Sequence, residues 1–147
     1  MASLAQVNMN MFGVDVERRA DESIILACPE PLAPLPSSIV SMLRNHAADH
    51  PDRDFLCERD GNGAWRRVTY DDVLKAANAI GQALLDGGHG PDRPIAILSD
   101  NSIDQAFVTF GAMTVSVPVM PVSPAYSLMS QDHEKLKSVI AHNDPSA

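Results

Sequence analysis

Residues 93–128 read RPIAILSDNSIDQAFVTFGAMTVSVPVMPVSPAYSL, and this stretch decides the fold. Its first part, 93–98, is rich in β-formers and predicts a strand. Ser102 and Gln105 form a capping pair, which predicts that a helix begins there. Apolar residues then recur at helical spacing and predict about three turns with one apolar face. These residues are Ile103, Phe107, Phe110 and Met113.

A second strand is predicted over 115–122, where the chain becomes apolar again around Pro118 and Pro121. A strand, a helix and a strand in this order form a β-α-β unit with parallel pairing and a right-handed crossover. Ligands of parallel sheets lie beyond the carboxyl ends of the strands. A ligand is therefore expected at the loops 99–101 and 123–126, although this α/β architecture alone names no reaction.

The first part of the chain predicts a hairpin and a linker. Strands are expected at 14–18 and 23–27, on either side of a turn that lacks the Asp-Gly pair favouring positive φ. Residues 29–36 carry four prolines and predict an extended, proline-rich linker. Residues 1–13 show no periodicity and are expected to be disordered.

A helix and a second hairpin are expected after the linker. The helix begins at Ser37 or Ser38 and stops before Pro51, because a residue that precedes proline avoids the helical conformation. The residues expected to face inward are Ile39, Val40, Met42 and Leu43. The hairpin joins 55–58 to 64–68 through a glycine-containing turn.

The longest helix is predicted with both of its ends. Thr69 and Asp72 form a capping box at its start, and Gly87 with Gly88 ends it. One face of this helix is apolar, so the helix is expected to pack against a core. The residues of that face are Val73, Leu74, Ala77, Ile80 and Leu84.

The composition predicts an acidic globular chain. At 147 residues, 45% of them hydrophobic, the chain is long enough for one core. Its formal net charge of -8 argues against binding to nucleic acid or to an acidic membrane surface. The apolar stretch 106–122 is interrupted by a glycine and two prolines, so no membrane-spanning helix is expected. No secretory signal is evident near Met1, and a cytoplasmic location is expected.

Three stretches together resemble the start of an adenylate-forming acyl-CoA synthetase. They are WRRVTYDDVLKAANAIGQALLDGG (65–88), PIAILSDNSIDQAF (94–107) and PVMPVSPAYSLMSQDHEKLKSVI (118–140). Within that superfamily, PVSPAYSL (121–128) and VDVERRADESIIL (14–26) resemble feruloyl-CoA synthase and its near relatives. The resemblance runs from Val14 to Ile140, and relatives often carry glycine at the positions of Glu22 and Ser116.

The resemblance implies that residues 14–147 are the N-terminal portion of the large AMP-binding domain, an incomplete α/β fold. In the whole enzyme that it implies, a carboxylic acid, ferulate or another hydroxycinnamate, reacts with Mg-ATP to give an acyl adenylate and pyrophosphate. Coenzyme A then displaces AMP to form the thioester. ATP, Mg and CoA are thus the expected cofactors of the full-length enzyme, and none is expected to bind this fragment.

Several motifs of that superfamily have no counterpart between Met1 and Ala147. These are the Ser/Thr/Gly-rich phosphate loop ending in Pro-Lys, the ribose-binding aspartate, the hinge and the lysine of a mobile C-terminal domain. The chain is therefore expected to be inactive scaffold, with no catalytic, cofactor-binding or metal-binding residue assigned. We also expect self-association through an exposed sheet surface. The alternatives are a truncated, non-enzymatic interaction module and an unrelated nucleotide-binding α/β domain, which the lack of a G-x-G-x-x-G motif disfavours.

Some residue patterns suggest sites, and for each a plainer interpretation is favoured. His46 and His50 resemble a zinc-binding pair, but His50 precedes a proline, so a solvated helix end is expected. Asp100 is expected to serve the turn before the helix rather than to bind phosphate or ribose. The glycine-rich 87–90 follows a helix and is expected to end it. Ser123 has no nearby base to activate it as a nucleophile. The cysteines, Cys28 and Cys57, are expected to be free thiols.

Overall fold

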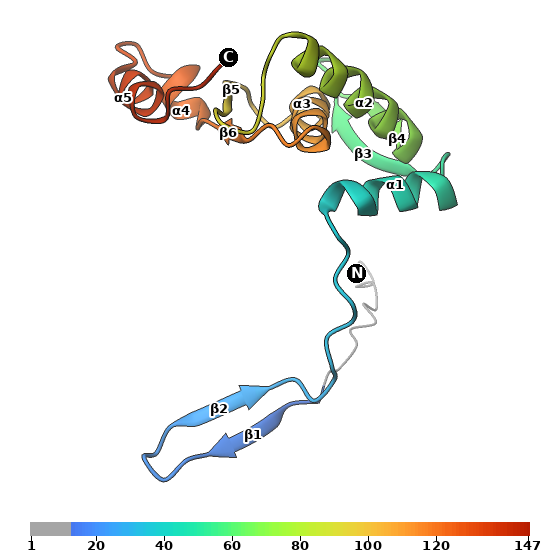
Figure 1. Cartoon of the computed structure of the whole chain (residues 1–147), viewed down its shortest axis with the longest axis vertical. Helices are drawn as coiled ribbons and strands as arrows, with labels where there is room; N and C mark the ends of the chain where they lie inside the picture. The colour runs from blue at the N-terminus through green and yellow to red at the C-terminus, as the bar shows by residue number, and fades with distance from the viewer. Residues whose placement is uncertain (1–12) are drawn as a thin grey trace, which may run out of the picture. The chain divides into compact units, whose positions relative to one another are not determined.

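The structure, a computed structural model, describes residues 13–147 (Figure 1). The chain divides into two compact units, with the cut between Leu35 and Pro36. The stretch 1–13 that is expected to be disordered lies outside the described residues, apart from Gly13. In the part of the chain that the structure describes, every helix is too short or too polar to cross a bilayer.

The first unit contains the antiparallel hairpin that the sequence predicts. Strand β1 (Asp15–Arg18) pairs with β2 (Ile24–Ala27). The turn is closed by a hydrogen bond from the Arg19 N–H to the Ser23 carbonyl, 2.9 Å long. Glu22 occupies this turn with a φ of 67°, in the left-handed region that favours glycine. A glutamate thus occupies a backbone conformation that glycine adopts without steric cost.

Helix α1 (Ile39–Asp49) opens the second unit. It begins at Ser38 as predicted, because Ser38 and Ser41 cap one another's backbone in a capping box. Its buried residues are Val40, Leu43 and Ala47. The expectation that Ile39 and Met42 face inward is wrong: Ile39 is 58% and Met42 43% exposed. The buried residues recur every three or four positions on one stripe of the helix, and these two lie beside that stripe.

The second hairpin pairs β3 (Asp54–Arg59) with β4 (Trp65–Thr69). Its turn is shaped by Asp60, whose carboxylate accepts hydrogen bonds from the N–H groups of Asn62 and Ala64, both 2.9 Å long. Gly63 completes the turn with a φ of 81°. The glycine is thus required by the backbone conformation of the turn.

Helix α2 (Tyr70–Asp86) has the start and the end that the sequence predicts. Thr69 and Asp72 form the capping box: the Thr69 hydroxyl accepts from the Asp72 N–H at 3.2 Å, and the Asp72 carboxylate accepts from the Thr69 N–H at 3.0 Å. Gly87 is the C-cap, and Gly88 follows with a φ of 76°. Val73 and Ala77 of the predicted apolar face are completely buried.

The β-α-β motif of the second unit has the predicted parallel pairing. Strand β5 (Ile95–Ile97) pairs with β6 (Val119–Pro121), and helix α3 (Ile103–Thr114) connects them. The second strand is shorter than the predicted 115–122, because Ser116 adopts a φ of 60° and turns the chain at the end of the helix. The second unit is therefore an α/β fold, as the sequence predicts.

Helices α2 and α3 lie side by side, and glycine lets them approach closely (Figure 1). A Cβ atom on Gly111 would lie 2.6 Å from Ile80 Cγ2 and 3.2 Å from the Ala77 carbonyl oxygen. On the other helix, a Cβ on Gly81 would lie 3.1 Å from the carbonyl oxygen of Gly111. The helix contact thus requires the absence of a side chain at Gly111.

The last residues of the chain return to β5. After α4 (Pro124–Ser127) and α5 (Glu134–Asn143), the Ser146 N–H donates to the Pro94 carbonyl, and the Ala96 N–H donates to the Ala147 carbonyl, each at 2.7 Å. Arg93 holds this segment through hydrogen bonds to the carbonyl and carboxylate oxygens of Asp144, 2.9 and 3.0 Å long. No local pattern in the sequence predicts this return, because the bonded residues are about 50 positions apart.

Candidate functional site

The two loops that the sequence predicts for ligand binding lie next to each other. Strands β5 and β6 are parallel, so both of their carboxyl ends open at the same edge of the sheet. A hollow of ≈ 500 Å³ lies there. It is lined by Ser99, Asp100, Asn101, Gln105, Pro121, Val122, Ser123 and Pro124. We call this hollow, between loop 99–101 and the start of α4, the crevice.

Local hydrogen bonds fix both walls of the crevice. On one side the Ser102 hydroxyl accepts from the Gln105 N–H at 3.0 Å and starts α3, as the predicted capping pair requires. On the other side the Ser123 hydroxyl accepts from the Ala125 N–H at 3.3 Å, and Pro124 stands in the first turn of α4. The crevice is thus a gap between two helix starts, built from turn-forming residues.

The residues that line the crevice offer hydroxyl, amide and carboxylate groups. None of its lining residues carries a positive charge, and Asp100 adds a negative one. Binding of a triphosphate needs cations or several converging backbone donors. The crevice therefore does not fit the phosphates of ATP, although its hydroxyl and amide groups suit a neutral, hydrogen-bonding part of a ligand.

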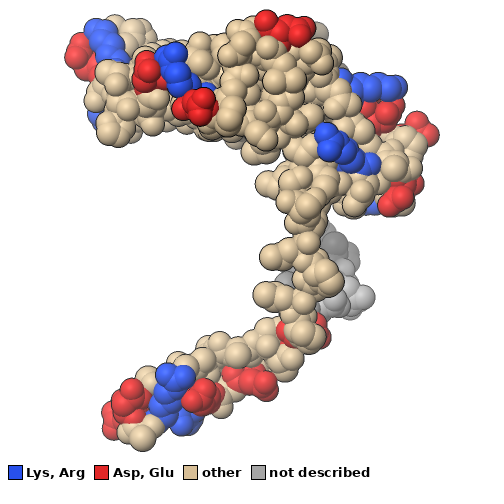
Figure 2. All heavy atoms as spheres, in the orientation of Figure 1, with Lys and Arg blue, Asp and Glu red and all other residues tan. Residues whose placement is uncertain are grey.

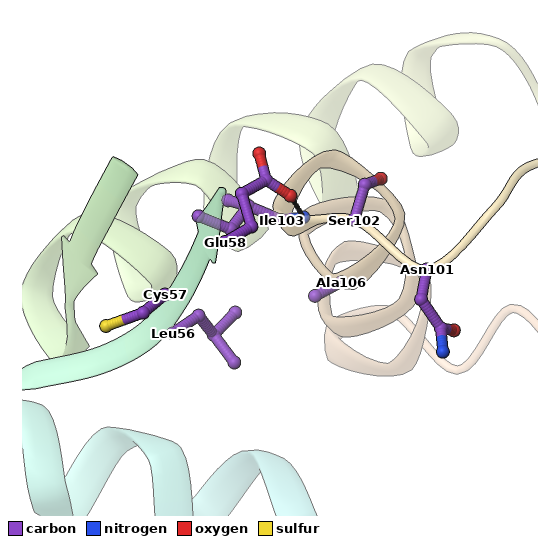
Figure 3. A pocket seen from close by; sticks show the side chains of 7 residues that line it. All are labelled: Leu56, Cys57, Glu58, Asn101, Ser102, Ile103 and Ala106. Carbon is purple, nitrogen blue, oxygen red and sulfur yellow. Dashed lines mark hydrogen bonds between the residues drawn. The ribbon is translucent and has the colours of Figure 1, made fainter. Parts of the chain in front are cut away.

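A second, smaller hollow of ≈ 200 Å³ lies beside the start of α3 (Figure 3). In it the Glu58 carboxylate, which comes from β3, accepts a hydrogen bond from the Ile103 N–H at 2.7 Å. Arg66 of β4 donates to the same carboxylate at 3.0 Å and to Asp104 at 2.9 Å. The hydrogen bond to Asp104 is the main reason why the pKa of Arg66 is raised. Charges on the hairpin and on the helix are thus joined in one network.

Glu58 was not among the predicted site residues, although its place on the strand carries a signal. Side chains two positions apart on a strand share a face, so Glu58 lies on the face of Leu56. Both residues are half-buried, whereas Cys57 between them is exposed. A carboxylate on the apolar side of a strand needs a partner. Which partner it finds depends on the tertiary fold and cannot be read from the strand itself.

The other patterns that suggested sites have structural roles. His46 stacks on the ring of Tyr70, with 5.2 Å between ring centroids, and His50 is the C-cap of α1 with a φ of -142°. The helix therefore ends before the two histidines can form a helical pair. Among residues 13–147, no group of three or more His, Cys, Asp or Glu side chains is arranged to hold a metal ion.

The glycine-rich stretch and the two polar loop residues are also accounted for. Residues 87–90 follow α2, whose C-cap is Gly87, so they end a helix. Asp100 and Ser123 are exposed at the crevice, where the Ser123 hydroxyl caps α4. In the sequence analysis these loops are expected at the ligand edge, and the structure brings them to one hollow.

Comparison with known families identifies the fold. The profile of the AMP-binding enzyme family matches residues 43–147. The chain belongs to this family. The chain is 28% identical over 118 residues to a probable non-canonical nonribosomal peptide synthetase of Salinispora arenicola. It is 27% identical over 92 residues to the phosphinothricin tripeptide synthetase PhsC of Streptomyces viridochromogenes. These matches cover 78% and 63% of this chain but only 2% and 8% of the relatives.

Solved structures of adenylate-forming ligases share the fold of this AMP-binding enzyme chain. The fatty acid AMP ligase from Legionella pneumophila superposes with a TM-score of 0.66 at 17% identity, over 74% of this chain and 18% of the ligase. A putative long-chain-fatty-acid CoA ligase from Rhodopseudomonas palustris gives a TM-score of 0.59 at 23% identity, over 74% of this chain and 25% of that chain.

The resemblance to the adenylate-forming superfamily is therefore confirmed at the level of family and fold. The chain spans about a fifth to a quarter of the length of these ligases. Residues 43–147 form part of the large domain of such enzymes.

Proposed function

We propose that this chain is the first part of an enzyme that activates a carboxylic acid with ATP and Mg²⁺ and transfers the acyl group to coenzyme A. A carboxylate oxygen attacks the α-phosphorus and pyrophosphate leaves. The sulfur of coenzyme A then attacks the carbonyl carbon and AMP leaves. The observation that carries this proposal is the family match over residues 43–147, which includes α2 and the whole β5-α3-β6 unit.

Within that enzyme we assign a scaffolding role to this chain. In-line attack at a phosphate requires cations or oriented donors that neutralise developing charge. The crevice lacks positive side chains, so residues elsewhere in the enzyme would supply them. We accordingly assign no catalytic, cofactor-binding or metal-binding residue to this chain, and we treat residues 14–147 as a partial adenylation domain.

We further propose an aromatic acid of the hydroxycinnamate class, such as ferulate, as the substrate. This narrower assignment rests on the tracts at 14–26 and 121–128, which resemble feruloyl-CoA synthase. Proteins of the same fold are named for other acids, among them a fatty acid AMP ligase.

We also propose a cytoplasmic location. Cys28 and Cys57 are free, exposed thiols, and a reducing compartment would preserve them in that form.

The test is pyrophosphate exchange with ATP, measured for the 147-residue chain and for the chain joined to its natural continuation. We expect no exchange with the chain alone and exchange with ferulate for the longer polypeptide. Activity of the chain alone above a heat-denatured control, abolished by removing Mg²⁺, would contradict the scaffolding role. Turnover of fatty acids but not of aromatic acids would reject the hydroxycinnamate assignment. A longer polypeptide without exchange on any acid would favour the non-enzymatic module instead.

A further inference from the structure

We propose that Glu58 is a positioning residue for the crevice: its carboxylate anchors the first turn of α3 and thereby sets the place of loop 99–101. The effect of Glu58 on activity rests on the proposed function, whereas the anchoring of α3 is a property of the fold and does not depend on it. Figure 3 shows the carboxylate of Glu58 directed at the start of α3, from a strand that lies outside the β-α-β unit.

The contact answers a specific need of the helix. Ile103 is the first residue of α3, and the N–H groups of a first turn have no acceptor within their own helix. Ile103 is only 3% exposed, so a water molecule can hardly replace Glu58 as the acceptor of its N–H. Glu58 accepts from this N–H at 2.7 Å, a length typical of hydrogen bonds to charged acceptors. Its negative charge also lies at the end of the helix that favours anions.

The carboxylate is itself held in place. Arg66 donates to Glu58 at 3.0 Å and reaches Asp104 of the same helix turn at 2.9 Å. The β3–β4 hairpin therefore bonds to α3 at two points. Glu58 accepts from the helix backbone at Ile103, and Arg66 donates to the side chain of Asp104. Of these two, only Glu58 fixes the position of the helix backbone, because Asp104 can follow Arg66 by rotating its side chain.

The anchored turn is also a wall of the crevice. Asn101 lines both the hollow that contains Glu58 and the crevice, so the loop before α3 separates the two. Gln105, in the first turn of the helix, lines the crevice as well. A shift of the Ile103 backbone would therefore move Asn101 and Gln105 together. Displacements on the order of an ångström at a positioning wall are enough to lower catalytic rates.

The anchoring is tested first by amide hydrogen exchange of the 147-residue chain, measured by NMR. We expect the Ile103 amide to exchange about tenfold faster in Glu58→Ala, the size that loss of one such hydrogen bond gives. Glu58→Gln, whose amide oxygen can still accept, should show a smaller increase. Asp104→Asn is the matched control: it weakens the pair with Arg66 but leaves the Glu58 contact, and its Ile103 exchange should stay at the wild-type rate.

An unchanged Ile103 exchange rate in a folded Glu58→Ala chain would overturn the inference. If Glu58→Ala does not fold, Glu58→Gln decides: exchange no faster than in Asp104→Asn would also overturn it. The link to the site is tested in the acid-activating enzyme, well below the melting temperature of each variant. There we expect kcat/KM to fall about tenfold in Glu58→Ala and to stay near wild type in Asp104→Asn.

A merely structural role would lower the melting temperature without changing kcat or KM at a temperature where the variant is folded. That result, together with faster Ile103 exchange, would overturn the positioning role. Absence of activity in the wild-type enzyme would count against the proposed function, whereas the exchange of the Ile103 amide would still decide whether Glu58 anchors α3.

Discussion

Several single residues of this chain, none of them glycine, adopt backbone conformations that favour glycine. Ser116 has a φ of 60° at the end of α3, a conformation that costs a non-glycine residue about 1–2 kcal/mol. Glycine avoids this cost but loses about 0.5–1 kcal/mol through the greater freedom of the unfolded chain. We therefore expect Ser116→Gly to raise the free energy of unfolding by about 0.5–1 kcal/mol, measured by urea denaturation. Ser116→Ala is the control, and a gain equal to that of glycine would argue against backbone strain.

A second residue-scale effect lies between the two long helices. Gly111→Ala would place a methyl group 2.6 Å from Ile80 Cγ2, so one of the helices must move. We expect a loss of about 1–3 kcal/mol, as in other overpacked interiors, despite the better helix propensity of alanine. Gly90→Ala is the matched control, since nothing lies within 4 Å of its added methyl group. Equal melting temperatures for the two variants would show that the helix contact adapts without cost.

At the scale of elements, the start of α2 makes stability depend on pH. The Thr69 N–H and then the Thr69 hydroxyl donate to the Asp72 carboxylate, and these bonds lower the pKa of Asp72. A pKa lowered by folding stabilises the folded state above the unfolded value of about 3.9, and this contribution is lost as the pH falls through the folded value. Asp72→Asn should therefore be less stable near neutral pH and should lose less stability below about pH 4 than wild type does.

Thermal melts followed by circular dichroism over that pH range measure the effect. Asp52→Asn, a change in the exposed loop after α1, is the control and should follow the wild-type curve. If Asp72→Asn kept the full acid sensitivity of the wild type, another carboxylate would be responsible for it.

The elements that the sequence predicts correctly are those with local signals. The capping box of Thr69 and Asp72 and the glycines after residue 86 give the limits of α2, because both act within a few residues. The exposure of Met42 was not predictable in the same way, since it depends on which neighbours cover α1. The crevice loops followed from the parallel topology, whereas the contact of Glu58 with Ile103 joins residues 45 positions apart and leaves no periodic pattern.

At the scale of the whole molecule, the proposed self-association has two candidate surfaces in the second unit. On the sheet, Val117 and Val122 are buried, while Val119 and Met120 are only half-buried. The outer edge of β6 offers few hydrogen-bond donors. The backbone groups of Pro118 and Val122 bond to β5, so by alternation those of Val119 and Pro121 face outward. Of these two residues, only Val119 has an N–H to donate. The other surface is the exposed flank of α1 with Ile39 and Met42, next to Met113 of α3. These three side chains are 58%, 43% and 38% exposed.

Sedimentation of charged variants distinguishes the two surfaces. Val119→Lys tests the sheet, and Ile39→Lys tests the helix flank. If the sheet associates, only Val119→Lys should reduce the average mass at high protein concentration, because a buried lysine in a contact must be desolvated. Reduction by Ile39→Lys alone would move the contact to α1, and a wild-type chain that sediments as a monomer would contradict self-association altogether.

The hydrogen bonds from Arg93 to Asp144 affect the order in which parts of the chain fold during synthesis. The two residues are 51 positions apart, and the backbone bonds of the same closure end at Ala147. Residues 36–143 can pair and pack as they leave the ribosome, but the edge of β5 at Ala96 stays uncovered until residues 144–147 follow. Synthesis adds only about 5–20 residues per second, which is far slower than helix formation or loop closure, so translation sets the length of this delay. Until then the outer N–H of Ala96 remains open to any other extended segment, so chaperone binding to nascent chains should concentrate on this interval and cease when Asp144 to Ala147 emerge.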